Sequence, residues 1–144
     1  MMDERSERNL VGVRPMLVNV VRRAHELVQD RDDGLGFIVI EGLRSVMRQA
    51  ELVKAGASRT MHSYHLDGRA VDLAATVMGE VRWDWPLYEV LAGLMKQAAR
   101  EQGFILTWGG DWRTFKDGPH FQIEDTPPLT ADAARSAEAM EATA

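Results

Sequence analysis

Apolar side chains recur with a helical period in three stretches of the chain. In residues 13–28 they return every three or four positions, which predicts an amphipathic helix. Residues 85–102 repeat this spacing and follow Asp84, which we expect to cap the helix. A shorter helix is predicted over residues 45–55, and Gly56 is well placed to end it. The pattern therefore predicts two long helices and a short one.

Between these helices lie short runs rich in β-branched and aromatic residues. Residues 37–42, "FIVIEG", read as a buried strand, and residues 69–77 read as a strand that presents Asp72 on one face. Further short strands are predicted at residues 81–83, 104–108 and 120–123. Because a hairpin or a single helix can connect most of these strands, we predict an α+β fold. Its helices pack on a small antiparallel sheet.

The length of 144 residues suits a single domain. Hydrophobic residues make up 45% and charged residues 27% of the chain, which is typical of globular proteins and argues against wholesale disorder. The apolar runs are too short or too interrupted to span a bilayer, and the charged start "MMDERSERNL" does not resemble a secretory signal. We therefore expect synthesis in the cytoplasm and no transmembrane segment.

Charge and cysteine content narrow the possible chemistry. The chain has no cysteine, so any metal must be held by His, Asp or Glu. The net charge is −5, but residues 124–144 contain five acids and a single basic residue. The remainder is nearly neutral, which disfavours nucleic-acid binding. We divide the chain into a catalytic domain, residues 1–126, and an acidic alanine-rich tail, residues 127–144.

The stretch "HSYHLDGRAVDL", residues 62–73, places polar residues at the start of an apolar strand. His65 and Asp72 are seven residues apart, and a fully extended chain would hold them about 20 Å apart. Both can reach one ion only if the chain turns, and Gly68 supplies the freedom for that turn. The alternative is that Asp72 binds a loop amide and His65 decorates the turn.

A zinc peptidase requires three nitrogen or oxygen ligands, an open position for water and a nearby carboxylate. "DGPH", residues 117–120, bends the chain before a strand that His120 opens, so Asp117 can lie beside the attacking water as a general base. The alternative is a solvated acid on a surface loop. Of the other histidines, His25 lies within a predicted helix, where a structural role is expected, and His62 is expected to face solvent.

Taken together, "SYHLDGRAVDL", "WGGDW" and "DGPHF" resemble the zinc-dependent D-Ala-D-Ala carboxypeptidase (VanY-like) superfamily. They are most similar to its phage endolysins of the L-alanyl-D-glutamate peptidase type. "EGLRSVMRQAELVKAG", residues 41–56, resembles the "EGxRS" segment of that family, so the resemblance covers residues 35–123. The sequence departs from many relatives in having Asp117 where they have glutamate, which is one methylene longer. We also expect no separate wall-binding domain.

The resemblance implies an α+β fold of the hedgehog/DD-peptidase type with one zinc ion at the sheet. His65, Asp72 and His120 would bind the Zn²⁺. Asp117 would take a proton from the attacking water and return it to the leaving amine. Arg44 would stabilise the oxyanion that forms on the scissile carbonyl.

Arg44 and Ser63 each have an alternative role that the sequence leaves open. Arg44 can instead form a surface pair with Glu41 or Asp67. Ser63 is expected to bind substrate or support a ligand, and its alternative is to cap the turn.

The loop around "GGD", residues 109–111, is our candidate for one wall of the cleft. Trp108 and Trp112 flank it and pack in the core by default, whereas Gly109 has no side chain to keep a peptide away. We expect Gly109 and Asp111 to contribute to substrate binding, although Asp111 can also pair with a basic group.

By this resemblance the chain is expected to be a monomeric zinc peptidase that acts on bacterial peptidoglycan. The expected scissile bond joins L-Ala to D-Glu, and the expected role is host-cell lysis once the membrane is breached. One alternative is a D-Ala-D-Ala carboxypeptidase or dipeptidase used in wall remodelling. Another is a non-catalytic, zinc-stabilised wall-binding module. Because two His and one carboxylate also suit non-haem iron, the identity of the metal stays open at this point.

Overall fold

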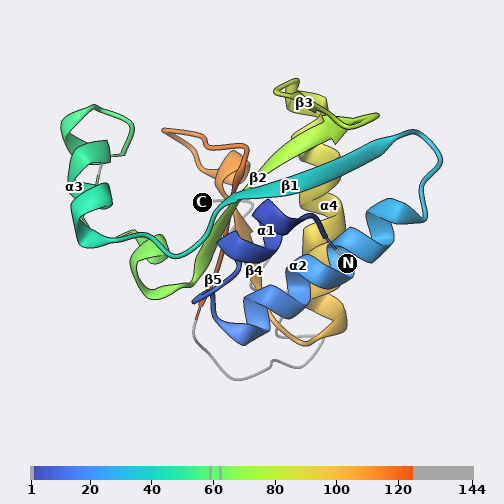
Figure 1. Ribbon diagram of the computed structural model, residues 1–144, viewed down its shortest axis with the longest axis horizontal. Coiled ribbons are helices and arrows are strands. Elements are labelled where there is room, and N and C mark those ends of the chain that lie inside the picture. The colour runs from blue at the N-terminus through green and yellow to red at the C-terminus, as the bar shows by residue number, and fades with distance from the viewer. Residues whose placement is uncertain (1, 59, 62, 125–144) are drawn as a thin grey trace.

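The computed structural model describes residues 2–58, 60–61 and 63–124 (Figure 1). Its helices and strands alternate along the chain. In order they are α1 (Glu4–Asn9), α2 (Pro15–Gln29), β1 (Leu35–Glu41), α3 (Val46–Lys54), the 3₁₀ helix η1 (Tyr64–Asp67), β2 (Ala70–Val77), β3 (Glu80–Arg82), α4 (Trp85–Glu101), β4 (Leu106–Trp108), the 3₁₀ helix η2 (Gly109–Asp111) and β5 (His120–Ile123).

The strands form one antiparallel sheet in the order β1-β2-β5-β4, and β3 pairs with β2. Along one edge of β2, Ala70, Val71 and Asp72 pair with β5, and the last three residues of the strand pair with β3. The whole of β1 lies along the other edge. The predicted α+β class with a small antiparallel sheet is confirmed.

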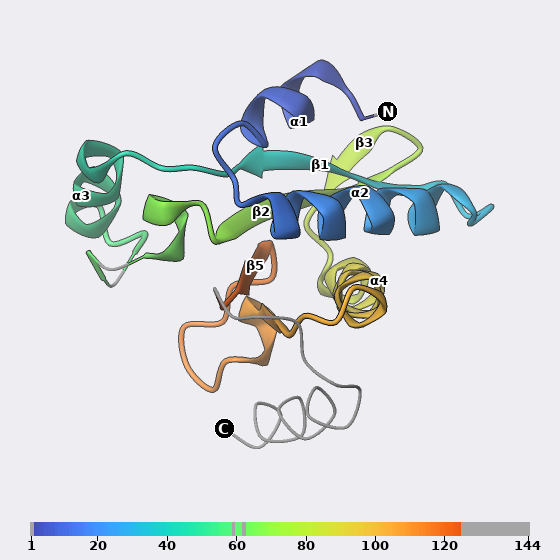
Figure 2. The same cartoon turned by 90° about the horizontal axis from the view of Figure 1, so that it is seen from below.

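The helices cover the sheet and enclose the core. Figure 2 shows α1 on one side of β1 and β2 and α4 on the other. α2 contacts both β1 and α4. The fully buried side chains of this core come from the predicted helices and strands, and the largest are Leu17, Val20, Val21, Leu73, Tyr88, Leu91, Met95, Leu106, Phe121 and Ile123. No helix in the described residues is both long enough and apolar enough to span a bilayer.

The helix α1 was not expected from the charged sequence at the amino terminus. The Asp3 carboxylate caps it by accepting a hydrogen bond from the backbone N–H of Ser6, at 2.7 Å. Ser6 is fully buried, and its hydroxyl accepts a hydrogen bond from the backbone N–H of Val39 in β1. A long-range contact with the sheet therefore holds a helix that has little apolar periodicity of its own.

The predicted helix at residues 45–55 is present as α3, but its apolar positions are not core. Val46 is 65% exposed, and Ala50 is also exposed. The one buried residue of this helix is the polar Gln49. In Figures 1 and 2, α3 extends to one side of the molecule, away from α2 and α4. α3 therefore contributes to the surface beside the sheet and not to the hydrophobic core.

Two boundary details differ from expectation. Asp84 does precede α4, but its carboxylate binds the Arg82 side chain and makes no capping hydrogen bond. The strand expected from residue 104 begins at Leu106. The predicted tail, residues 127–144, lies outside the described residues, as does His62.

Candidate metal centre and active-site pocket

Three side chains from separate parts of the sheet region converge on one point. His65 lies in η1, Asp72 lies in β2, and His120 is the first residue of β5. The antiparallel register places Asp72 directly opposite His120. Asp72 Oδ1 lies 3.2 Å from His65 Nε2 and 3.3 Å from His120 Nδ1. The candidate ligand atoms of all three residues lie within 4.8 Å of one another, so in the described part of the chain they form a group that could hold a metal ion.

The turn that brings His65 back to the sheet depends on Gly68. This glycine ends η1 in the left-handed conformation, with φ of 76°, as the sequence predicted. A Cβ atom at this position would lie 2.4 Å from the carbonyl oxygen of Gly12. The Gly68 carbonyl in turn accepts a hydrogen bond from the backbone N–H of Arg14. The loop between α1 and α2 therefore fixes the turn that positions His65.

Each imidazole ring is oriented by a hydrogen bond from the ring nitrogen that points away from Asp72, which we call its outer nitrogen. His65 Nδ1 donates to the carbonyl of Gly42 at 2.8 Å, and His120 Nε2 donates to Gln122 Oε1 at 2.7 Å. With these protons placed, the inner nitrogens of the neutral rings direct their lone pairs at Asp72 Oδ1. Lone pairs facing a carboxylate oxygen require a cation or protons between them. The donor set therefore fits a metal ion bound by two nitrogens and one oxygen.

The pKa values of Asp72 and His120 are both shifted in the direction that favours an ionised carboxylate facing a positive charge. Burial would raise the pKa of Asp72, but hydrogen bonds from His120 and His65 outweigh it and hold the pKa below its ordinary value. Burial would lower the pKa of His120, but the hydrogen bond and charge of Asp72 outweigh it and raise the pKa. The carboxylate therefore stays ionised and binds whichever cation, proton or metal, occupies the centre.

Asp117 lies in the loop before β5, and together with the three clustered residues it lines a pocket. Its backbone N–H donates to the Gly109 carbonyl, and its own carbonyl accepts from the His120 N–H. Burial raises the pKa of the Asp117 carboxyl, and the charge of Asp72 raises it further. The two histidines and Arg44 offset only part of this rise. A carboxyl with a raised pKa beside a metal centre is suited to exchanging a proton.

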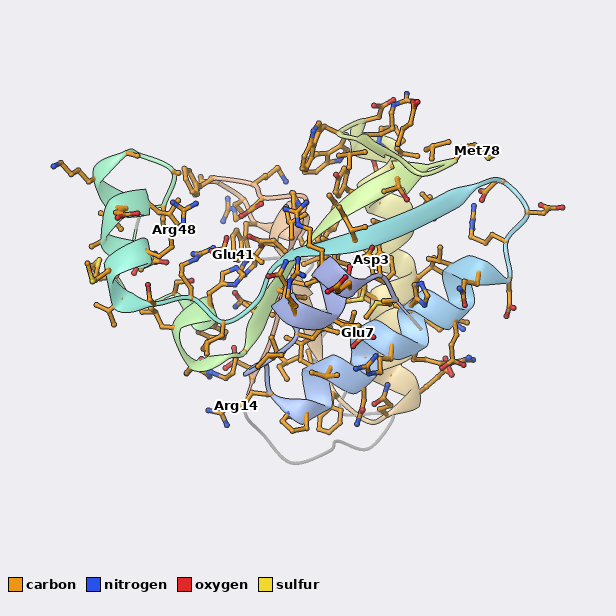
Figure 3. All side chains as sticks on the ribbon, viewed as in Figure 1. Asp3, Glu7, Arg14, Glu41, Arg48 and Met78 are labelled. Carbon is orange, nitrogen blue, oxygen red and sulfur yellow. The ribbon has the colours of Figure 1, made fainter. Side chains whose placement is uncertain are left out.

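Arg44 also lines the pocket, with 9% of its surface exposed. Nε and Nη2 donate to the two oxygens of Glu41 at 2.8 and 2.7 Å, and Nη1 donates to Gln49 Oε1 at 2.7 Å. Nη2 also lies 3.6 Å from Asp72 Oδ2. The alternative pairing with Glu41 is therefore present, but as a largely buried pair, whereas Asp67 pairs with Arg69. Figure 3 labels Glu41 near the end of β1, where the chain leads towards α3.

The structure separates the three residues expected to bind substrate. Ser63 lines the pocket, and its hydroxyl accepts from the His65 N–H, so it also caps η1. Gly109 is buried, with no room for a Cβ atom beside the Asp117 carbonyl oxygen, and it is not among the residues that line this pocket. Asp111 pairs with Lys96 of α4 and is not among the residues that line this pocket. Of this set, only Ser63 borders the pocket.

The pocket has a volume of about 370 Å³, which lies within the range of small-ligand sites. Its polar side carries the His65, Asp72 and His120 cluster. Its apolar sides include Leu52 of α3 and the rings of Trp112 and Phe115 from the loop before β5. The Trp112 ring lies 5.1 Å from the His120 ring. A peptide can therefore lie between α3 and this loop with its backbone near the candidate metal centre.

Sequence reasoning missed two polar residues that hold this site. Gln122, which binds His120, lies two positions further along the same strand, so the two-residue period of a strand would have indicated it. Gln49 binds Arg44, the Ser58 hydroxyl and the Thr60 carbonyl. No local pattern marks Gln49, because its partners are brought together only by the folded chain.

Comparison with known proteins agrees with this arrangement. The family model described as phage L-alanyl-D-glutamate peptidase matches residues 1–127. The L-alanyl-D-glutamate peptidase of Listeria phage A118 is 35% identical over 117 residues, which are 81% of this chain and 41% of that protein. The peptidase of the same name from Escherichia phage T5 is 32% identical over 116 residues, 78% of this chain and 81% of that protein.

A solved structure extends the similarity to three dimensions. The crystal structure of the Serratia marcescens L-Ala D-Glu endopeptidase ChiX superposes with a TM-score of 0.78 at 49% identity, covering 85% of this chain and 89% of that chain. The chain spans less than half of the Listeria phage relative but most of the other two proteins. The resemblance noted from the sequence motifs is confirmed. The chain belongs to the phage L-alanyl-D-glutamate peptidase family.

Proposed function

We propose that this protein is a zinc peptidase that hydrolyses the bond between L-alanine and D-glutamate in the stem peptides of bacterial peptidoglycan. The names of the family and of its relatives support the choice of bond. The observation that carries the proposal is the convergence of His65, Asp72 and His120 beside a carboxyl that does not belong to their cluster. This arrangement provides three ligands and a separate proton acceptor.

The metal would be held by His65 Nε2, His120 Nδ1 and a carboxylate oxygen of Asp72. Two nitrogens and one oxygen suit zinc in a catalytic site, which keeps a further position open. Bound zinc would supply Lewis-acid polarisation of the scissile carbonyl and lower the pKa of a water molecule to about 7. Gly42 and Gln122 would keep both rings turned towards the metal. Because non-haem iron also accepts such a set, elemental analysis of the purified protein decides between the two metals.

Asp117 would act as the general base and then as the general acid. Its carboxylate would accept a proton from the attacking water and deliver that proton to the nitrogen of the leaving D-glutamate. The loop geometry fixes its position, since the Asp117 backbone is hydrogen-bonded to both Gly109 and His120.

Arg44 would stabilise the negative charge on the carbonyl oxygen during attack. Its three bonds to Glu41 and Gln49 use three of its five N–H groups and hold the guanidinium in place. An arginine fixed in this way loses little side-chain freedom when substrate binds. Its positive charge also faces Asp72, which lets it support the ionised ligand.

The test is the variant Asp117→Ala, assayed on purified sacculi with mass analysis of the released fragments. We expect zinc content to stay near one ion per chain while turnover falls about 100- to 10,000-fold, the usual contribution of a general base. Asp117→Glu restores a carboxylate and is expected to recover activity. Asp33→Ala, which removes an exposed carboxylate paired with Arg31, is the matched control and should leave both measurements unchanged.

The released fragments separate the competing functions. Cleavage next to the sugar-attached alanine supports the proposal, whereas release of terminal D-alanine would assign a carboxypeptidase. Zinc binding without any cleavage by the unaltered protein would assign a non-catalytic module. We further propose a role in host-cell lysis, which a turbidity assay on membrane-permeabilised cells measures directly.

A further inference from the structure

A group of exposed apolar side chains lies at the β2–β3 hairpin and the start of α4. Met78 is 81% exposed, Val81 43%, Trp83 61% and Trp85 41%. Figure 3 labels Met78 at the outer tip of this hairpin. Single exposed apolar residues are ordinary, but here two exposed tryptophans are separated by one residue in the sequence, and a group of exposed apolar side chains is typical of an interaction site. We call Trp83 and Trp85 the aromatic platform.

The platform is held rigidly from beneath. The Trp83 ring is parallel to the Tyr88 ring, with an interplanar angle of 2° and centroids 6.1 Å apart. Tyr88 is buried, and its hydroxyl accepts from the Ala75 N–H and donates to the Arg82 carbonyl. These two hydrogen bonds tie the ring to both strands of the hairpin. Trp83 therefore presents a flat, fixed surface to solvent, which lowers the entropy lost when a ligand binds to it.

The platform is continuous with the active-site loop. The Trp85 ring packs on the Trp108 ring, with centroids 5.6 Å apart, and Trp108 Nε1 donates to the Gly118 carbonyl at 2.7 Å. A Cβ atom on Gly118 would lie 3.2 Å from the Trp85 ring and 3.5 Å from the Tyr88 ring. Gly118 directly follows Asp117, which lines the pocket. The same short segment thus touches the pocket on one side and the platform on the other.

We propose that Trp83 and Trp85 bind the glycan strand of peptidoglycan by stacking against the carbon-bound hydrogens of its sugar rings. This inference rests on the proposed function, because the stem peptide is joined to the glycan through the alanine next to the expected scissile bond. A polymer whose peptide occupies the pocket therefore carries its sugars close to the pocket, and the platform adjoins the Asp117–Gly118 segment at one wall of that pocket. The planar Arg82 and Asp84 side chains, paired beside Trp83, provide hydrogen-bonding groups for sugar hydroxyls.

Charge favours a neutral carbohydrate over an anionic lipid surface. The hairpin and helix start carry two acidic residues, Glu80 and Asp84, against one basic residue, Arg82. Proteins that dock on anionic membranes through aromatic side chains surround them with Lys and Arg. A sugar ring requires instead a flat aromatic face and neighbouring polar groups, and both are present here.

The experiment compares three variants of Trp83 on two substrates. Trp83→Ala and Trp83→Leu remove the aromatic face, whereas Trp83→Tyr keeps one. On intact sacculi we expect kcat/KM to fall about tenfold for the Ala and Leu variants and little for the Tyr variant. On a soluble stem peptide without sugar, all three should match the parent protein. Val11→Ser replaces a side chain that is 74% exposed in the loop between α1 and α2, and it should change neither rate.

A binding measurement keeps this inference separate from the proposed function. Glycan strands stripped of their stem peptides should co-sediment with the Asp117→Ala protein and lose that binding when Trp83→Ala is added. This result requires no turnover, so it holds or fails independently of which bond is cut. Equal losses on both substrates, or unchanged activity on sacculi, would overturn the inference. Binding to phosphatidylglycerol vesicles that is lost in Trp83→Ala but kept in Trp83→Leu, without binding to glycan, would assign the platform to a membrane instead.

Discussion

Replacing Gly68 by alanine should weaken both the fold and the metal centre. Gly68 adopts φ of 76°, and an added Cβ would lie 2.4 Å from the Gly12 carbonyl oxygen, so backbone must move against backbone. Because Gly68 N–H donates to the His65 carbonyl, that movement carries His65 away from Asp72. A comparison is provided by Gly79, which has φ of 84° but no atom within 4 Å of the added Cβ.

Substitution by alanine changes the free energy of unfolding through two effects, and only the first of them is common to both glycines. Left-handed backbone costs an alanine about 1–2 kcal/mol at either position, and the smaller gain from stiffening the unfolded chain is also common to both. The forced displacement at Gly68 adds about 1–3 kcal/mol, the usual cost of overpacking. Gly68→Ala should therefore lower the free energy of unfolding by about 2–5 kcal/mol and Gly79→Ala by about 1–2 kcal/mol.

Urea unfolding of the metal-free variants measures this difference, and competition with a chromophoric chelator measures zinc affinity. We expect zinc affinity to fall about 10- to 100-fold in Gly68→Ala, as it does when ligand orientation is lost, and to stay unchanged in Gly79→Ala. Equal destabilisation of the two variants would refute the argument from the Gly12 contact. Parental zinc affinity in Gly68→Ala would show that His65 does not depend on this turn.

Substitutions can test three further contacts one at a time. Gln122→Ala removes the acceptor that orients the His120 ring, so chelator competition should show about 10- to 100-fold weaker zinc binding, whereas Gln122→Glu keeps an acceptor and much of the affinity. Tyr88→Phe leaves a buried backbone N–H of β2 without its acceptor, which should lower the free energy of unfolding by about 1–3 kcal/mol in urea. The hydrogen bond from Arg22 lowers the pKa of Glu7 from its ordinary value of 4.5, so the pair stabilises the fold above that pH and the stabilisation is lost as pH falls through the lowered pKa. Thermal unfolding of Glu7→Gln should therefore change less between neutral and acidic pH than that of the parent protein.

The local pattern of the sequence was sufficient for most elements of the fold. The period of the apolar side chains predicts the helices α2 and α4 and the strand β2, and a continuous run of β-branched and aromatic residues predicts β1. The same periodicity placed Asp72 on the opposite face from Val71 and Leu73, and the Gly-Pro bend placed His120 at the start of β5. The candidate cluster could be proposed because its members lie at recognisable points of regular elements.

Other features escaped prediction because their partners are distant in sequence. α1 is fixed by the bond between Ser6 and β1, and Gln49 is buried because Arg44 and Thr60 meet it from two sides. The exposure of Val46 likewise contradicts the helical pattern, since α3 extends away from the core that would have covered its apolar face. The helix or strand propensity of a segment does not indicate which distant segments it will contact in the folded protein.

The sequence by itself determined most of the helices and strands, the residues available to hold a metal and the family. Only the tertiary structure decided that β5 pairs with β2 in the register that sets His120 opposite Asp72, and that Gly12 closes the turn bringing in His65. It also decided which expected substrate residues border the pocket, since Ser63 does and Asp111 pairs with α4. The physical reason is that periodicity records which face of each element is apolar, whereas strand register and loop contacts arise only when those faces pack together.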